Sequence, residues 1–121
     1  MATGAVSPTD SLALRGGRDH AGPMLFACAL SMDLHIPASG SLKAKRTVVK
    51  HVVETAKARF GVAAAEVGHQ DQWQRAELGF AAVAGTAGHV EDVLDSVERF
   101  VWSHPEIEVL DGHRSWLETA E

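Results

Sequence analysis

The chain has 121 residues and a mass of 12.9 kDa, which suits one globular domain and argues against a repeat or multidomain architecture. Its 45% hydrophobic and 22% charged residues are typical of a folded protein and exclude wholesale disorder. The 11 Lys and Arg residues against 16 Asp and Glu give a net charge of −5, which excludes an overall basic nucleic-acid wrapper but leaves room for a local basic patch.

The number of cysteines and the length of the apolar segments indicate where in the cell the protein is expected. Cys28 is the only cysteine, which excludes an internal disulfide and is typical of a reducing cytoplasm. Apolar runs fall well short of the roughly 20 residues that a transmembrane helix needs. We therefore expect a cytoplasmic protein without a membrane partner.

The two ends of the chain differ in composition from the middle. Residues 1–23 are rich in Gly, Ser, Pro and Ala without lasting periodicity, which predicts a disordered tail. Met24 stands directly before the first alternating segment and is a candidate natural start. We expect the folded domain over 24–117 and a short C-terminal tail over 118–121.

The first predicted elements are a strand and a long helix. Apolar and polar residues alternate over 26–36, which predicts a half-buried strand that ends at Pro37. Ser41 suits the N-cap of an amphipathic helix over 42–60, whose apolar residues recur three and four apart. Gly61 would end this helix.

The second half of the domain repeats the pattern. A short strand is expected over 62–69, and after a polar turn a second alternating strand over 74–84. Thr86 would cap a second amphipathic helix that Pro105 stops. A last strand is expected over 106–117.

This order of elements predicts an α+β ferredoxin-like βαββαβ sandwich, with four antiparallel strands and both helices on one face. The residues expected on the open sheet face are small or acidic: Ala27, Ala29, Ser31, Asp33, Glu66, Glu77, Gly79, Ala81 and Glu108. RNA-recognition domains stack bases on aromatic rings of this face, so that mode of binding is disfavoured. Small residues suit the close approach of a second copy, which makes a homodimer through the open face possible.

The predicted topology brings most polar residues of chemical interest to one end of the sheet, where the first helix starts and the second and third strands connect. The residues expected there are His35, Ser39, Ser41, Lys43, Lys45, Arg46, His69, Gln70, Asp71, Trp73, Arg75 and His104.

The first helix carries an unusual charge. Between Lys43 and Arg59 it has six basic residues and one acid, Glu54. Cations in a first helical turn oppose the helix dipole by roughly 0.3–1 kcal/mol each, whereas an anion there would be favoured. The residues expected to bind an anion or RNA phosphates are Ser41, Lys43, Lys45, Arg46 and Lys50, extended by Trp73 and Arg75. The alternative is a solvated helix face whose cations pair with acids elsewhere.

The polar loop residues allow other chemistry. His69 with Asp71 could form a base and its orienting carboxylate, but an Asp71 that caps its own turn is favoured. A metal held by His35, His69, His104 and Asp71 is disfavoured because no tight ligand spacing is present, so we predict no metal and no cofactor. Gln70 completes this loop constellation. For the tryptophans we favour packing roles, with Trp73 as a binding anchor the alternative.

Two segments resemble the YlxP-like family of small bacterial proteins of unknown function. They are LHIPASGSLKAKRTVVK, with Ser41-Leu42-Lys43 and Lys45-Arg46, and AAAEVGHQDQWQRAELG, with His69-Gln70-Asp71 and Trp73-Gln74-Arg75. The likeness extends from about Met24 to Val109. It implies a ferredoxin-like fold and no established reaction; the family's genes lie near those of translation initiation, which implies a role with RNA or the ribosome. Gly68 departs from the family, which usually has an acid there.

The sequence thus favours a non-enzymatic cytosolic binding protein that engages RNA or ribosomal components. No catalytic residue is assigned. The alternatives are an enzyme acting on a phosphoester or nucleotide with His69 as base, a ligand-sensing domain at the same end of the sheet, and a dimeric scaffold.

Overall fold

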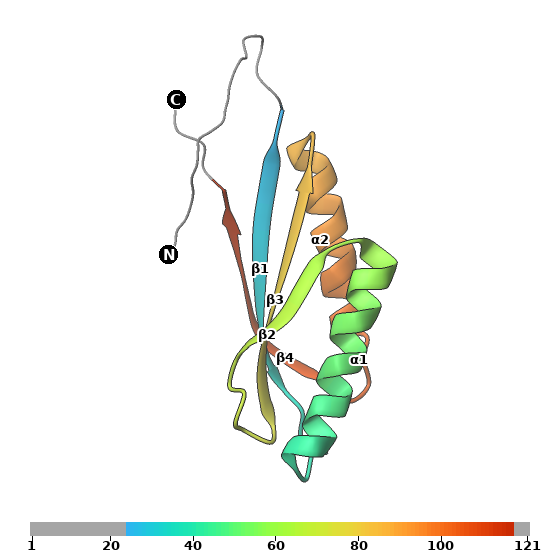
Figure 1. Ribbon diagram of the computed structural model, residues 1–121, viewed down its shortest axis with the longest axis vertical. Helices are drawn as coiled ribbons and strands as arrows, with labels where there is room; N and C mark the ends of the chain where they lie inside the picture. Colours follow the sequence, from blue (N-terminus) through green and yellow to red (C-terminus); the bar gives the residue numbers. More distant parts are fainter. Residues whose placement is uncertain (1–23, 118–121) are drawn as a thin grey trace.

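A computed structural model describes residues 24–117, which form a ferredoxin-like α+β sandwich. The elements are β1 (Phe26–His35), α1 (Leu42–Phe60), β2 (Ala63–Gly68), β3 (Arg75–Ala84), α2 (Ala87–Trp102) and β4 (Glu108–Trp116). The strands form one antiparallel sheet in the order β2-β3-β1-β4, and both helices cover the same face of it (Figure 1). The predicted fold class is confirmed, whereas the predictions for residues 1–23 and 118–121 lie outside the described residues.

The core lies between the sheet and the helices, and it consists of the apolar residues that alternate along β1 and β3 and recur along the helices. The deeply buried apolar side chains include Leu30, Met32, Leu34, Ile36, Ala76, Leu78, Phe80, Val52, Ala56, Val90, Leu94, Val97 and Val101. Their periods of two in the strands and of three or four in the helices are those that the sequence predicts.

The helix ends follow from local capping chemistry. The hydroxyl of Ser41 accepts a hydrogen bond from the backbone N–H of Ala44 at 3.0 Å, and that of Thr86 accepts one from His89 at 3.1 Å. Gly61 ends α1 at a φ of 69°, in the left-handed region that glycine adopts without strain. Within residues 24–117, none of the helices is long and apolar enough to cross a bilayer.

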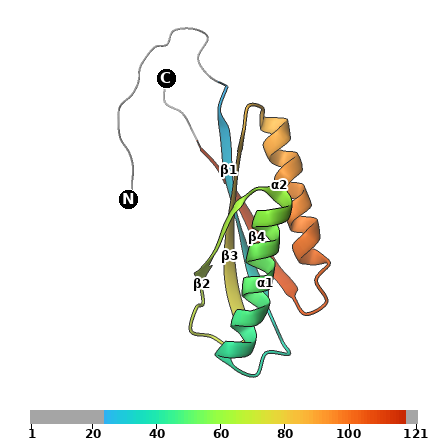
Figure 2. The same ribbon diagram turned by 45° about the vertical axis from the view of Figure 1, so that its right-hand side comes forward.

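We call the end of the sandwich where α1 begins the loop end, and the opposite end the cap end. The loop end contains the segment 37–41 and the β2–β3 loop over 69–74, which lie side by side at the bottom of Figure 1. The backbone N–H of Ile36 donates to Gln74 O at 2.8 Å, and the Gln74 amide donates to Pro37 O and Ser39 O at 3.0 and 3.3 Å. The cap end has only the short α1–β2 and β3–α2 turns (Figure 2).

One face assignment from the sequence is wrong, and it concerns β2. Glu66 lies on the helix side of the sheet beneath α1, whereas Ala63, Ala65 and Val67 are exposed on the open face. The register is consistent with this, because Ala65 lies opposite Gly79 of the open face. A six-residue strand of small residues has no strong apolar alternation, so a contact with a helix residue decides which side faces in.

Candidate functional site

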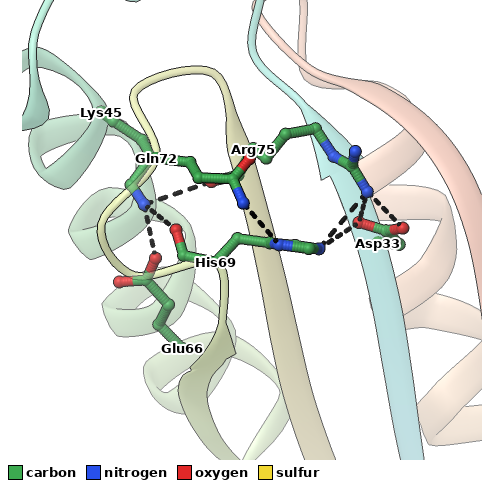
Figure 3. Close-up of polar contacts among 6 residues, drawn as sticks. All are labelled: Asp33, Lys45, Glu66, His69, Gln72 and Arg75. Atoms are coloured by element: carbon green, nitrogen blue, oxygen red, sulfur yellow. Dashed lines mark hydrogen bonds and ion pairs between the residues drawn. The ribbon is translucent and has the colours of Figure 1, made fainter.

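A buried lysine organises the loop end. Lys45, in the first turns of α1, has 0% of its side chain exposed. Its ammonium donates hydrogen bonds to the carbonyl oxygens of His69, Arg75 and Gln70 at 2.8, 3.2 and 3.3 Å. It also forms an ion pair with Glu66, whose Oε2 lies 2.9 Å away (Figure 3). Lys45 thereby joins α1 to β2, to β3 and to the loop between them.

The Lys45 ammonium has several hydrogen-bond and ion-pair partners because it is buried. A buried ammonium loses its hydration and needs both an opposite charge and acceptors for its three hydrogens. Glu66 supplies the charge, and the β2–β3 loop supplies the carbonyl groups. The carbonyl groups of the loop in turn gain a donor in the Lys45 ammonium. The expectation that Lys45 contacts an external anion is therefore corrected.

A second network lies on the open face of the sheet beside the same loop. Asp33 of β1 receives two hydrogen bonds from Nη2 of Arg75, at 2.8 and 2.7 Å. Nε2 of His69 lies 3.3 Å from the same Arg75 nitrogen and 3.5 Å from Asp33 Oδ1. The other ring nitrogen of His69 contacts the Gln72 amide at 3.2 Å (Figure 3). These residues connect the loop to the end of the sheet.

The network changes the roles expected for three residues. Arg75 is committed to an internal carboxylate through one of its terminal nitrogens. His69 finds its carboxylate in Asp33 rather than in Asp71, which is exposed and forms no side-chain hydrogen bond among residues 24–117. Both ring nitrogens of His69 are engaged, so the ring is arranged to hold the loop in place. Its φ of 58° fits a residue held in a tight turn.

The other histidines expected at the loop end contact different partners from those of His69. Nδ1 of His35 contacts Glu108 of β4 at 2.9 Å. His104 packs edge-on against His51, with ring centroids 6.0 Å apart, and accepts a hydrogen bond from the Glu106 backbone. Among the residues that the structure describes, no three His, Cys, Asp or Glu side chains are grouped so as to hold a metal ion.

The exposed face of α1 carries the basic residues that remain available. Lys43, Arg46 and Lys50 are exposed, and in the described part of the chain none of them pairs with a carboxylate within 4.0 Å. Their spacing of three and four residues puts them on one side of the helix. We call these three residues the basic stripe. Ser41 precedes it, but its hydroxyl is occupied as the N-cap of α1.

Trp73 is 55% exposed, which contradicts the packing role that the sequence favours. Its indole lines an open cavity of about 610 Å³ together with Leu110 of β4, which is 51% exposed. The other lining residues are polar: His35, Gln72, Gln74 and Arg75. Trp102, at the end of α2, is 62% exposed and also departs from the structural role expected for it.

The site depends on residues that sequence reasoning did not connect. Asp33 and Glu66 were expected on the open face and were not connected to the basic residues of the loop end, yet each neutralises one of those cations. A signal existed for Glu66: a lysine in a first helical turn, on the same helical side as Val49 and Val52, needs a buried counter-charge. Leu110 could not be assigned to the cavity, because a register shift in the β1–β4 pairing sets its position.

Comparison with known proteins identifies the family to which the chain belongs. The profile of a family described as "Protein of unknown function (DUF503)" matches residues 27–114. The chain is also 40% identical over 79 residues to a Bacillus subtilis (strain 168) protein named "Uncharacterized protein YlxP", covering 65% of this chain and 86% of that protein. Both findings confirm the resemblance seen in the two loop-end segments.

Proposed function

This chain belongs to the DUF503 family of proteins of unknown function, and we propose from its own surface that it is a non-enzymatic protein that binds RNA. The binding surface is the basic stripe of α1, and its ligand groups are phosphates. The proposal also implies a cytosolic location, where RNA is available.

The observation that carries the proposal is the unpaired state of the basic stripe. The chain as a whole has a net charge of −5, and α2 displays carboxylates such as Glu91 and Asp92, yet the stripe lacks an internal partner in the described residues. The first turns of α1 hold the cations Lys43 and Arg46 and its first turn has no acid, although the helix dipole there favours negative charge. A bound anion would offset the repulsion among these cations and their unfavourable interaction with the helix dipole.

The geometry of the stripe favours a chain of phosphates over a single small anion. From Lys43 to Lys50 the helix advances by about 10 Å, at 1.5 Å per residue. Charges spread along such a line match a repeating phosphate backbone, whereas a single small anion would need them to converge. Long exposed side chains position a backbone without reading its sequence, so we expect little sequence preference from the stripe itself.

A salt-dependent titration tests the proposal. Wild-type protein is added to a fluorescein-labelled, mixed-sequence, 12-nucleotide single-stranded RNA, and anisotropy is measured at several salt concentrations. The triple variant Lys43→Gln, Arg46→Gln, Lys50→Gln should lose about tenfold or more in affinity at low salt. It should also reduce the slope of log K against log salt by about two, because each phosphate contact on a single strand contributes about 0.7.

A matched variant separates the stripe from net charge. Lys57→Gln, Arg59→Gln, Arg99→Gln removes the same three charges from other exposed positions. It should bind within about threefold of wild type. Equal weakening by both triple variants would assign the effect to net charge, and no binding by the wild-type protein would contradict the proposal.

The open sheet face supports a second proposal, association with another copy of the chain. Val67 and Val83 are 56% and 64% exposed on this face, and the residues between them are small, including Ala81 and Gly79. A flat face of this kind lets two sheets approach closely, and a second copy offers the same apolar surface. Among residues 24–117 the face carries no Phe, Tyr or Trp for stacking bases.

Sedimentation at two protein concentrations tests this second proposal. The wild-type protein should sediment as a dimer at the higher concentration, and Val83→Arg should sediment as a monomer because it buries a charge in the interface. His89→Arg, at an exposed position in α2, is the control and should not change the mass. A wild-type monomer at both concentrations would contradict the proposal.

A further inference from the structure

The cavity beside Trp73 combines an apolar floor with unused hydrogen-bonding groups. The hydrogen bonds of the Arg75 side chain all pass through Nη2, so Nη1 has no partner within the described residues. Gln72 and Gln74 use their amide nitrogens, and their carbonyl oxygens are likewise unpartnered there. The three residues that carry this donor and these two acceptors line the same cavity as Trp73.

The loop that carries Trp73 is firmly held. Its backbone carbonyls receive the buried ammonium of Lys45, and Gln74 fastens its end to the segment 37–41. The Gln70 amide donates to Glu66 O at 3.1 Å, and Gln72 contacts the ring of His69. A loop held by so many contacts yet leaving its largest side chain in solvent is preorganised to present that side chain to a ligand.

The chemistry of the cavity suits a flat ring with polar edges. An indole offers a stacking face worth about 1–3 kcal/mol per base to an unpaired nucleobase. An aliphatic side chain would cover Trp73 and Leu110, but it would leave the Arg75 and glutamine groups without partners. A nucleobase uses both kinds of surface, because its edge carries donors and acceptors in the plane of the ring.

We propose that this cavity binds a nucleobase of single-stranded RNA, stacked on Trp73 beside Leu110, while the basic stripe holds neighbouring phosphates. The inference rests on the proposed function. The two surfaces belong to the same end of the sandwich, because Lys43 and Arg46 lie in the first turns of α1 and the β2–β3 loop that carries Trp73 lies beside the start of that helix. A base-paired strand cannot use the cavity, since its bases are already stacked and their edges are paired.

The test compares single-stranded and double-stranded RNA. The labelled 12-nucleotide strand and its duplex are titrated with wild type, Trp73→Ala, Trp73→Phe and the control Trp102→Ala, which removes an indole of similar exposure. Trp73→Ala should weaken single-strand binding about tenfold and leave duplex binding within twofold of wild type. Trp73→Phe should retain most of the affinity, and Trp102→Ala should bind as wild type does.

A spectroscopic readout assigns the contact to the indole itself. The variant Trp102→Phe, Trp116→Phe keeps Trp73 as its sole tryptophan, since the chain has three. Its fluorescence should be quenched by the single strand and much less by the duplex. Thermal unfolding followed by circular dichroism verifies that each variant is folded.

The two proposals fail in different ways. Should Trp73→Ala bind the single strand within twofold of wild type while the basic-stripe variant loses affinity, the nucleobase site is wrong and the phosphate-binding surface stands. Should the basic-stripe variant bind as tightly as wild type, the proposed function itself is contradicted. Equal quenching of Trp73 by single strand and duplex would also overturn the nucleobase site.

Discussion

The two ends of the sandwich are built by different means. At the cap end, short turns are fixed by local devices: the left-handed Gly61 and the hydroxyl of Thr86. At the loop end, Lys45 of α1 and Gln74 of the β2–β3 loop donate to backbone carbonyls of other segments, and Arg75 of β3 pairs with Asp33 of β1. The turns of the cap end are fixed by contacts close in the sequence, whereas the loops of the loop end are held by side chains more than 20 positions away.

This difference separates what folding needs from what the proposed binding surface needs. A helix cap and a glycine suffice to reverse the chain at the cap end. The loop end has many more side-chain contacts than a chain reversal needs. Its side chains fix the shape of a loop whose tip displays an indole. We interpret the buried charge at the loop end as the means by which the protein keeps Trp73 and the basic stripe in a defined arrangement.

The largest effect is expected from removing the buried ammonium. Lys45→Met leaves Glu66 without its counter-charge and removes one donor from each of three carbonyl groups, of which His69 O keeps the Gln72 N–H. The free energy of unfolding should fall by about 3–5 kcal/mol, the usual effect of breaking a buried pair on one side. Urea denaturation measures it, with Lys43→Met, an exposed lysine two residues earlier, as the control within about 0.5 kcal/mol of wild type.

The double variant Lys45→Met, Glu66→Leu sharpens this test. Removing both charges relieves the unpaired carboxylate, so part of the lost stability should return. The backbone carbonyls of the loop still lack their donor, so the recovery should be incomplete. A Lys45→Met variant within 0.5 kcal/mol of wild type would contradict the view that the loop end depends on this charge.

Removing either helix cap should lower the free energy of unfolding by less than Lys45→Met does, and by similar amounts at the two ends. Ser41→Ala at the loop end and Thr86→Ala at the cap end each remove one hydroxyl that accepts from a helix N–H. Each should destabilise the protein by about 1 kcal/mol, measured by the same urea titration. Similar losses of unfolding free energy for the two variants would show that the two ends differ in their long-range contacts and not in their helix caps. A loss for Ser41→Ala several times that for Thr86→Ala would contradict this view.

The smallest effect concerns Cys28, which lies near the cap end of β1 and is 2% exposed. Burial raises the pKa of its thiol above the ordinary value, which lowers the thiolate fraction at any given pH. The native protein at pH 8 should therefore react slowly with Ellman's reagent, and protein in concentrated guanidinium rapidly. Rapid reaction of the native protein would contradict the buried position.

The sequence predicts the fold well because the core elements have strong periodic patterns. The helix expected over 42–60 has those bounds in the structure, since Ser41 and Gly61 mark its ends by their own chemistry. β1 and β3 expose and bury the residues that alternation predicts. The inward face of β2 was predicted wrongly because this short strand has small residues on both sides and lacks a clear apolar alternation.

The site was less predictable than the fold, because Lys45 is buried and Trp73 is exposed, the opposite of what these residue types usually show. A lysine is almost never fully buried without a partner, so Lys45 was expected at the surface, and its partner Glu66 sits on the strand whose face was misassigned. Trp73 was expected to pack, but the loop contacts hold it outward. The pairing of Asp33 with Arg75 depends on the register of β1 against β3, which no local pattern encodes.

The most direct test of the account compares the two ends in one experiment. Two-dimensional ¹H–¹⁵N NMR spectra are recorded while the 12-nucleotide single-stranded RNA is added to wild-type protein. We predict that amide signals of residues 42–50 and 69–75 shift, whereas those of 61–63 and 84–88, at the cap end, stay in place. Shifts confined to the cap end, or spread evenly over the domain, would contradict the claim that the loop end is the binding surface.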